Sequence, residues 1–276
     1  MEKPIVSIII PTFNNRSTIR ETLESVYDQT YSNIEVVIVD DGSTDGSMDD
    51  ILAYIHEKPS CKLLTQLNQG PSSARNLGFE NSTGTYIIFL DADDILASTY
   101  VEECINAFLS HPTLGIVYAQ THLIERQIGV FNLSDYSPTT IMHQNCFPIC
   151  AMIKADIFRK IGMFDTNLRY GEDWEMWIRY TQKNNRIHKI ERPLFFYRKR
   201  RSKDSISDLN RLENVSDDAH LYIYNKHYST YKAMGWDIIT LINSRKENQK
   251  YKHKYYGEWY RKLAYWVMGK KPVENS

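Results

Sequence analysis

The chain has 276 residues, of which 42% are hydrophobic and 24% are charged. These proportions are typical of a globular protein and exclude an intrinsically disordered chain, a collagen-like chain and a disulfide scaffold. The 33 basic and 34 acidic residues give a net charge of −1, which argues against a general attraction to nucleic acid. Aromatic residues are abundant at 12%, and 19 of them are tyrosines.

Targeting and redox signals are mostly absent from the sequence. The first apolar run, residues 5–10, is too short for a signal-peptide core or a membrane span, and no segment has 18 uninterrupted apolar residues. We therefore expect a soluble, cytoplasmic protein. The cysteines form no CxxC pair and are expected to be free and mostly buried. They are Cys61, Cys104, Cys146 and Cys150.

The first half of the chain alternates predicted strands with predicted helices. Runs of β-branched and other apolar residues predict the strands, and apolar residues at helical spacing predict the helices. Thr18 and Glu21 predict a capping box at the start of the first helix. This alternation predicts a mainly parallel sheet with right-handed crossovers. The predicted strands are 6–10, 34–39, 63–67 and 86–90, and the helices are 18–27, about 51–55 and 70–79.

The second half is less regular. Its predicted strands are 115–119 and 194–198, its predicted helices are 154–161 and 173–183, and residues 129–150 form a loop-rich insertion. Trp174 and Trp177 lie three residues apart and are expected in the core, although one of them could form a sugar platform. After about Ser207 the β pattern disappears and the chain becomes helical, basic and tyrosine-rich.

Two predicted strands end in acidic clusters, at residues 40–41 and 91–94. Ligands of open α/β sheets bind outside the carboxyl ends of the strands. Several carboxylates at one edge repel one another, and a divalent cation or the donors of a ligand would relieve that repulsion. Mg²⁺ or Mn²⁺ bound by an Asp-x-Asp pair would in turn hold a diphosphate. Asp-Asp-Gly-Ser is also an ordinary turn sequence, but two clusters at matching strand ends favour a site.

Other phosphate-binding and catalytic motifs are missing from the sequence. There is no G-x-x-x-x-G-K-[ST], no G-x-G-x-x-G after the first strand and no G-x-S-x-G elbow. The absence of the first two argues against a P-loop NTPase and a dinucleotide dehydrogenase.

Five motifs follow one another along the chain. They are VSIIIPTFN at 6–14, VIVDDGSTD at 37–45, NxGxxxARNxG at 68–78, YIIFLDADD at 86–94 and GEDW at 171–174. Taken together and in order, they resemble those of family 2 glycosyltransferases of the bacterial surface-polysaccharide type. The resemblance covers roughly residues 4–205 and implies a GT-A fold, which is α/β with a single Rossmann-like, mainly parallel sheet. It does not cover the helical C-terminal extension.

The resemblance implies a nucleotide-sugar site at the ends of the first strands. Pro11, Thr12 and Asn14 would line the nucleotide pocket. Asp41 would accept a hydrogen bond from uracil, which favours UDP over other carriers. Arg75 would lie near the base or the diphosphate, where a guanidinium suits phosphate oxygens.

The same resemblance implies a metal site in the fourth motif. Asp91 and Ala92 would sit against the ribose, and Asp93 would be the direct ligand of Mn²⁺ or Mg²⁺, with Asp91 as a second candidate ligand. The metal would stabilise the negative charge that develops on the diphosphate.

Asp173 is the general base that the resemblance implies. The base must reach the acceptor hydroxyl from the side opposite the leaving UDP, so it cannot belong to the metal cluster. Asp173 begins a predicted helix, whose N-terminus is expected to lower the pKa of Asp173 and keep it ionised. Adjacent Glu172 is the competing candidate, and both residues are also ordinary acids for the start of a helix.

One position departs from the family pattern. Arg200 stands where family members often carry a histidine that approaches the metal or the diphosphate. We expect Arg200 to bind the diphosphate and partly replace that imidazole. A solvated basic loop is the alternative.

The chain is expected to comprise a catalytic domain at 1–207 and a helical region at 208–276. The catalytic domain would have a nucleotide-binding half at about 1–94 and an acceptor half at 95–207. Residues 245–271 carry nine basic and two acidic residues, a net charge of +7, with an interleaved aromatic stripe. Such a segment suits the anionic inner face of the cell membrane, near a lipid-linked acceptor. Packing on the catalytic domain, or on a second copy in a homodimer, is the alternative.

These observations together predict an inverting glycosyltransferase of the hexosyltransferase type that uses a UDP-sugar and a metal ion. Its acceptor would be a glycan or a lipid-linked acceptor in polysaccharide biosynthesis. Three alternatives are considered. A sugar-phosphate nucleotidyltransferase would need a glycine-rich basic loop after the first strand, and a receiver-like domain would place its acids there. An inactive scaffold that only binds sugar nucleotides would keep the pocket without the chemistry.

Overall fold

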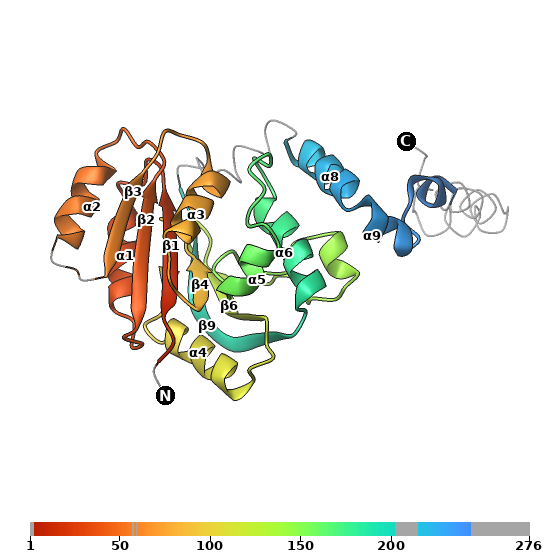
Figure 1. Cartoon of the computed structure of the whole chain (residues 1–276). Helices are drawn as coiled ribbons and strands as arrows, with labels where there is room; N and C mark the ends of the chain where they lie inside the picture. Colours follow the sequence, from red (N-terminus) through yellow and green to blue (C-terminus); the bar gives the residue numbers. More distant parts are fainter. Residues whose placement is uncertain (1–2, 57, 59, 202–214, 244–276) are drawn as a thin grey trace, which may run out of the picture. The chain divides into compact units, whose positions relative to one another are not determined.

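The computed structural model describes residues 3–56, 58, 60–201 and 215–243 (Figure 1). The chain divides into two compact units, Met1–His220 and Leu221–Ser276. The boundary predicted at 207/208 falls outside the described residues.

The first unit is built on a mixed sheet with the strand order β3-β2-β1-β4-β8-β6-β9-β5, and β7 pairs with β6. The first four strands are parallel to one another, as predicted, and Thr12 at the end of β1 stands beside Asp40 at the end of β2. The loops that follow these strands therefore emerge at one edge. The four strands are β1 (Val6–Thr12), β2 (Ile34–Asp40), β3 (Cys61–Thr65) and β4 (Tyr86–Phe89).

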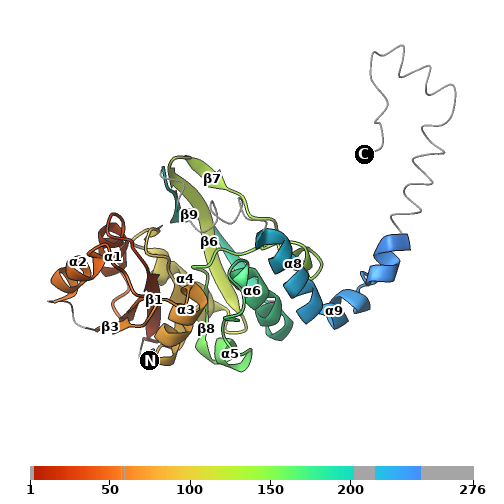
Figure 2. The same ribbon diagram turned by 90° about the horizontal axis from the view of Figure 1, so that it is seen from above.

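The other strands extend the sheet beyond β4. β8 (Met152–Lys154) runs antiparallel to both β4 and β6 (Ile116–Glu125). β6 and β9 (Ile187–Lys199) are long parallel neighbours that run side by side (Figure 2). The short strands β5 (Ile95–Leu96) and β7 (Gly129–Phe131) pair antiparallel with β9 and β6. Both predicted strands of this half exist, and both are longer than predicted.

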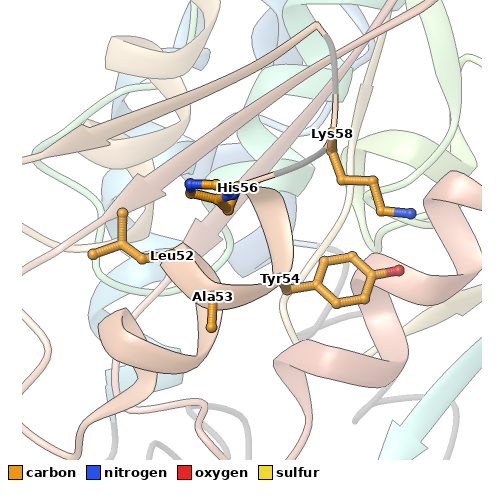
Figure 3. A pocket seen from close by; sticks show the side chains of 5 residues that line it. All are labelled: Leu52, Ala53, Tyr54, His56 and Lys58. Carbon is orange, nitrogen blue, oxygen red and sulfur yellow. The ribbon is translucent and has the colours of Figure 1, made fainter.

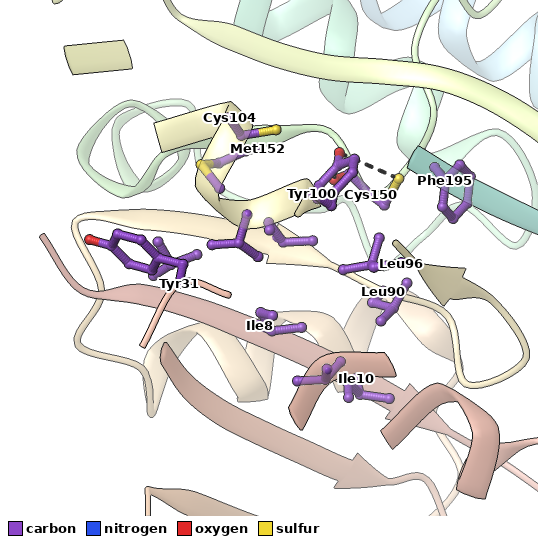
Figure 4. Packing of buried hydrophobic residues seen from close by; sticks show 14 of the residues in the cluster. Ile8, Ile10, Tyr31, Leu90, Leu96, Tyr100, Cys104, Cys150, Met152 and Phe195 are labelled. Carbon is purple, nitrogen blue, oxygen red and sulfur yellow. Dashed lines mark hydrogen bonds between the residues drawn. The ribbon is translucent and has the colours of Figure 1, made fainter. Parts of the chain in front are cut away.

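Helices cover both faces of the sheet, as predicted. Ile8 and Ile10 of β1 point to one face and pack in a core that α1 and α4 also line (Figure 4). Ile9 points to the other face, where α3 lies so close that a Cβ on Gly78 would stand 2.5 Å from Ile9 Cγ2. Gly78 thus lets α3 approach the strands. The helices of the first unit include α1 (Ile19–Tyr27), α2 (Ser47–Ile55), α3 (Pro71–Glu80), α4 (Tyr100–Ser110), α5 (Ala155–Lys160) and α6 (Glu172–Lys183), and Thr140–Met142 form a 3₁₀ turn.

Some local predictions are wrong. Thr18 precedes α1 but makes no side-chain cap, because its hydroxyl donates to the carbonyl oxygens of Ala92, at 3.0 Å, and Asn15. Leu52 shares the apolar pattern of α2 with Ile51 and Ile55 but is 51% exposed, and Leu67, predicted as the end of the third strand, lies beyond β3 with 86% of its surface exposed. The prediction of free, mostly buried cysteines is confirmed, since only Cys61 is partly exposed.

The second unit contains the end of α8 (Val215–Lys226) and all of α9 (Tyr228–Ala233). Its described aromatic residues form a small cluster in which the Tyr224 ring lies 4.7 Å from that of Tyr231 and the Tyr224 hydroxyl donates to Trp236 O. The basic segment 245–271 lies outside the described residues. Within the described part of the chain, no helix is both long and apolar enough to cross a membrane.

Candidate active site

The loops that follow β1 and β2 are tied to each other. The backbone N–H of Asn14 donates to Ser43 Oγ at 2.9 Å, and Asn14 Oδ1 accepts from the Thr44 N–H at 2.8 Å. Asn14 is exposed and holds a φ of 54°, whereas Pro11 and Thr12 are buried at the end of β1. The structure thus brings the first predicted nucleotide-binding residues to the edge of the sheet.

Asp41 holds the loop that leads into α3. Its carboxylate accepts hydrogen bonds from Gln66 Nε2 at 2.7 Å and from the backbone N–H groups of Gln69 and Gly70 at 2.8 Å. Gly70 has a φ of +88°, which a glycine adopts easily, and α3 begins at the next residue. Asp41 is only 3% exposed, so its carboxylate orders this edge of the site.

The turn after β4 is held by the end of β9. The backbone N–H of Arg198 donates to Asp94 Oδ1 at 2.8 Å, and the Arg198 Nε donates to Asp93 O at 2.7 Å. Arg200 Nε donates to Asp93 Oδ2 at 2.7 Å. Arg200 therefore stands directly on the carboxylate that was predicted to bind the metal.

The surroundings of the acids in this turn disfavour the ionised carboxylates. Burial raises the pKa of Asp93, although Arg200 opposes this and Asp91 adds repulsion. Burial also raises the pKa of Asp94 well above its ordinary value, and repulsion from Asp93 and Asp91 adds to the effect. A cation brought close to this turn would relieve the repulsion.

The acid pair fits a divalent ion only in part. Arg75 occupies one oxygen of Asp91, and Arg200 occupies one oxygen of Asp93. Within the described ranges, no three His, Cys, Asp or Glu side chains are placed to hold a metal ion. Hard cations such as Mg²⁺ commonly take one or two carboxylates and draw their remaining ligands from phosphate and water, and Asp91 with Asp93 fits that mode.

Arg75 joins the two halves of the site. Its side chain is 5% exposed, and its terminal nitrogens donate to Asp91 Oδ1 at 2.7 Å and to Glu172 Oε1 at 2.8 Å. The guanidinium also lies over the ring of Phe164, 5.4 Å from its centre. The two carboxylates raise the pKa of Arg75 against the effect of its burial. Arg75 thus lies beside the acidic turn after β4, and both of its terminal nitrogens already hold acids.

Asp173 is the second residue of α6, which begins directly after Gly171, a glycine with a φ of 71°. Burial raises the pKa of Asp173 to about 7, and repulsion from Glu172 adds to the effect. The expectation that the helix N-terminus lowers this pKa is therefore wrong, because loss of water and a neighbouring carboxylate outweigh the backbone hydrogen bond from Trp174. The competing candidate Glu172 is bound to Arg75.

One residue beside Asp173 was not predicted from the sequence. Asn145 Nδ2 donates to Asp173 Oδ2 at 2.7 Å. Asn145 belongs to the loop-rich insertion, and a single asparagine among several polar loop residues carries no signal that would single it out. Trp174 and Trp177 are 6% and 0% exposed, which confirms that both belong to the core.

A separate hollow lies elsewhere on the first unit. It is lined by residues at the C-terminal end of α2 and just after it, including Tyr54, His56 and Lys58 (Figure 3). The chain enters β3 at Cys61, so this hollow is near the start of that strand. The acids at the ends of β2 and β4 belong to the opposite edge of the sheet, and the hollow adds nothing to their site.

Comparison with known proteins decides the family. The model of Glycosyl transferase family 2 matches residues 7–162, more than half of the chain. The chain belongs to this family. It is 30% identical to an uncharacterized glycosyltransferase of Rickettsia prowazekii over 227 residues, which are 78% of this chain and 70% of that protein. It is 41% identical to an uncharacterized glycosyltransferase of Haemophilus influenzae over 159 residues, which are 55% of this chain and 63% of that protein.

Solved structures show the fold of this family 2 chain. The crystal structure of residues 1–349 of S. aureus TarS in complex with UDP matches with a TM-score of 0.62 at 20% identity, covering 84% of this chain and 74% of that one. The complex of the same protein with UDP-GlcNAc also matches with a TM-score of 0.62, at 22% identity, over 71% of this chain and 58% of that one. The predicted GT-A fold is confirmed.

Replacing Arg75 tests the buried ion pairs. We expect Arg75→Met to lower the free energy of unfolding by about 3–5 kcal/mol, because Asp91 and Glu172 would lose their buried partner. Chemical denaturation measures this change. Arg20→Met is the control, because Arg20 pairs with Glu24 on the surface with 76% of its side chain exposed, and should change stability by at most about 1 kcal/mol. Equal effects of the two substitutions would contradict the role given to Arg75.

Proposed function

We propose that this protein transfers a sugar from a UDP-sugar to a hydroxyl group of a glycan or lipid-linked acceptor, with inversion at the anomeric carbon and Asp173 as the general base. The proposal rests on the difference between the neighbouring acids Glu172 and Asp173. Glu172 is bound to Arg75, whereas Asp173 has a pKa raised to about 7. A general base works best when its pKa lies near the working pH.

The proposed reaction is a single displacement at the anomeric carbon. Asp173 takes the proton of the acceptor hydroxyl while that oxygen forms a bond to the anomeric carbon. The bond from the anomeric carbon to the phosphate oxygen breaks, and UDP leaves with the electron pair. Glu172, the neighbour of Asp173 in the chain, and Asp91 both bind Arg75. The proposed base and the proposed nucleotide edge therefore belong to one cluster. Attack from the face opposite the leaving UDP gives the inverted product.

The nucleotide assignment rests on the edge formed by Pro11, Thr12, Asn14 and Asp41. An ionised carboxylate offers about four acceptor positions, and the described donors to Asp41 use three of them. On this proposal, the remaining position accepts from an N–H of uracil. The likeness to TarS, whose complexes contain UDP and UDP-GlcNAc, supports the choice of UDP. Asp91 and Ala92 would then face the ribose.

We assign Mn²⁺ or Mg²⁺ to Asp93 and Asp91, with the diphosphate and water completing the coordination. When bound, the ion supplies positive charge that stabilises the leaving diphosphate. Arg200 occupies Asp93 in the structure and, on this proposal, turns to the diphosphate when the donor binds. Its fork of donors suits phosphate oxygens.

The membrane is the second partner that we propose. A helical segment follows Asp237, whose carboxylate accepts from the Thr240 N–H and hydroxyl. Four apolar side chains of this segment are 46–66% exposed: Ile238, Ile239, Leu241 and Ile242. The +7 segment 245–271 follows directly in the sequence. Exposed apolar residues beside positive charge suit an anionic lipid surface, which would bring the enzyme to a lipid-linked acceptor.

Asp173→Asn and a pH profile test the base. We expect the substitution to reduce turnover of a UDP-sugar by at least about 100-fold and to leave UDP binding unchanged, because the amide cannot accept the proton. In the unaltered protein, kcat/KM should fall as the pH drops through about 7, since protonation of Asp173 removes the base. Full turnover by Asp173→Asn would refute the proposal. Turnover by the unaltered protein would distinguish the enzyme from an inactive scaffold, which shows no turnover at all.

Arg200→Ala tests the proposed contact with the diphosphate. We expect the affinity for UDP in the presence of Mn²⁺, measured by calorimetry, to fall about tenfold or more because a charge-assisted hydrogen bond is lost. Arg201→Ala is the matched control, since the described contact of Arg201 with Glu125 is made by its backbone N–H. Equal affinities in all three proteins would leave Arg200 as a residue that only holds Asp93.

Flotation with vesicles tests the membrane contact. The full chain should float with vesicles that contain an anionic lipid and stay in solution with neutral vesicles. A chain ending at Ser244 should bind much less, because most of the positive charge has been removed. Equal recovery of the two chains would contradict membrane contact, and a shift from dimer to monomer on truncation would assign the segment to a second copy.

A further inference from the structure

Asn145 has a defined orientation beside the proposed base. Its Oδ1 accepts from the backbone N–H of Phe147 at 3.1 Å, and its Nδ2 donates to Asp173 Oδ2 at 2.7 Å. A backbone N–H can only donate and a carboxylate can only accept, so the two ends of the amide cannot be exchanged. The NH₂ group must therefore face Asp173.

The loop that carries Asn145 is anchored on both sides by α6. Before Asn145, the indole N–H of Trp174 donates to Ile141 O. After it, the fully buried ring of Phe147 lies edge-on to Trp177, with the ring centres 5.4 Å apart. Asp173 is on the same helix as both tryptophans. The pair Trp174 and Trp177, three residues apart, thus fastens the loop and the base to one rigid element.

The two oxygens of Asp173 each receive one N–H group. Oδ1 accepts from the Trp174 N–H at 2.7 Å, and Oδ2 accepts from Asn145. The charged groups that act on Asp173 are Glu172 and Asp91, which disfavour its ionised form, and Arg75, which favours it. Hydrogen bonds to the ionised carboxylate also favour it and fix the plane of its oxygens.

We propose that Asn145 is a positioning residue that holds the Asp173 carboxylate in the orientation in which it takes the proton of the acceptor hydroxyl. This inference rests on the proposed function of Asp173. It adds a residue from the loop-rich insertion to the catalytic machinery and gives the two buried tryptophans a role in supporting it.

The test compares Asn145→Asp and Asn145→Ala with the unaltered full-length protein. Asn145→Asp keeps the oxygen that accepts from Phe147 but loses the donor to Asp173, so it separates anchoring of the loop from support of the base. We expect kcat to fall about 10- to 100-fold in both variants, which corresponds to one lost hydrogen bond to a charged group. The affinity for UDP should not change, because the described hydrogen bonds of the Asn145 side chain are with Asp173 and Phe147 and not with the proposed nucleotide-binding residues.

The pH profile supplies a readout that a purely structural role would not move. Loss of a donor to the ionised carboxylate should shift the acid limb of kcat/KM to higher pH, and more so in Asn145→Asp, which adds a second negative charge. Gln144→Ala is the control, since Gln144 is exposed and its side chain donates to Ser134. It should keep the kcat and the pH profile of the unaltered protein.

The outcomes separate this inference from the proposed function. An unchanged kcat and acid limb in both Asn145 variants, with Asp173→Asn inactive, would overturn the role of Asn145 alone. An active Asp173→Asn would overturn both. A raised KM for the acceptor at unchanged kcat and unchanged acid limb would make Asn145 an acceptor contact and would also overturn the inference. A lower melting temperature in Asn145→Ala but not in Asn145→Asp, with kcat reduced in both, would support it.

Discussion

The rest of the site depends on the ion pairs that the buried guanidinium of Arg75 makes. A positive charge removed from water must be paired, and Arg75 is paired with Asp91 after β4 and Glu172 at the start of α6. This requirement couples the acidic turn after β4 to the helix that carries Asp173. It also engages Glu172 and so distinguishes two adjacent acids that are otherwise alike. Gly78, three residues further along α3, allows that helix to pack closely on Ile9 of β1 and Val39 of β2.

Charge balance around the strand ends explains the remaining features. Arginines at the end of β9 reach the turn after β4, where Arg198 binds its backbone and Arg200 binds Asp93. Even so, burial raises the pKa values of Asp93 and Asp94, so the turn is suited to take up further positive charge. Asp173 lies across Arg75 from that turn and keeps a pKa near 7. The edge that we propose to bind a cation and a diphosphate is therefore separate from the carboxylate that we propose as the proton acceptor.

Much of the fold could be predicted because burial on two faces selects for continuous runs of β-branched residues, as in β1 and β2. Predictions that depended on a single side chain were less secure. Thr18 has the sequence of a helix cap, but its hydroxyl is within reach of Ala92 O after the chain folds, and that contact takes its place. Leu52 fits the apolar pattern of α2 yet is exposed, because nothing in the pattern specifies how wide the covered face of a helix is.

The sequence by itself determined the family, the parallel half of the sheet and the presence of acids at its carboxyl ends, because these follow from local runs and from motifs in order. Only the tertiary structure decided the states of those acids. Arg75 meets Glu172 across 97 positions of the chain, and Asn145 meets Asp173 across 28. Such contacts depend on how loops and helices pack, and so do the desolvation and repulsion that raise the pKa of Asp173. A helix N-terminus read from sequence alone predicts the opposite shift.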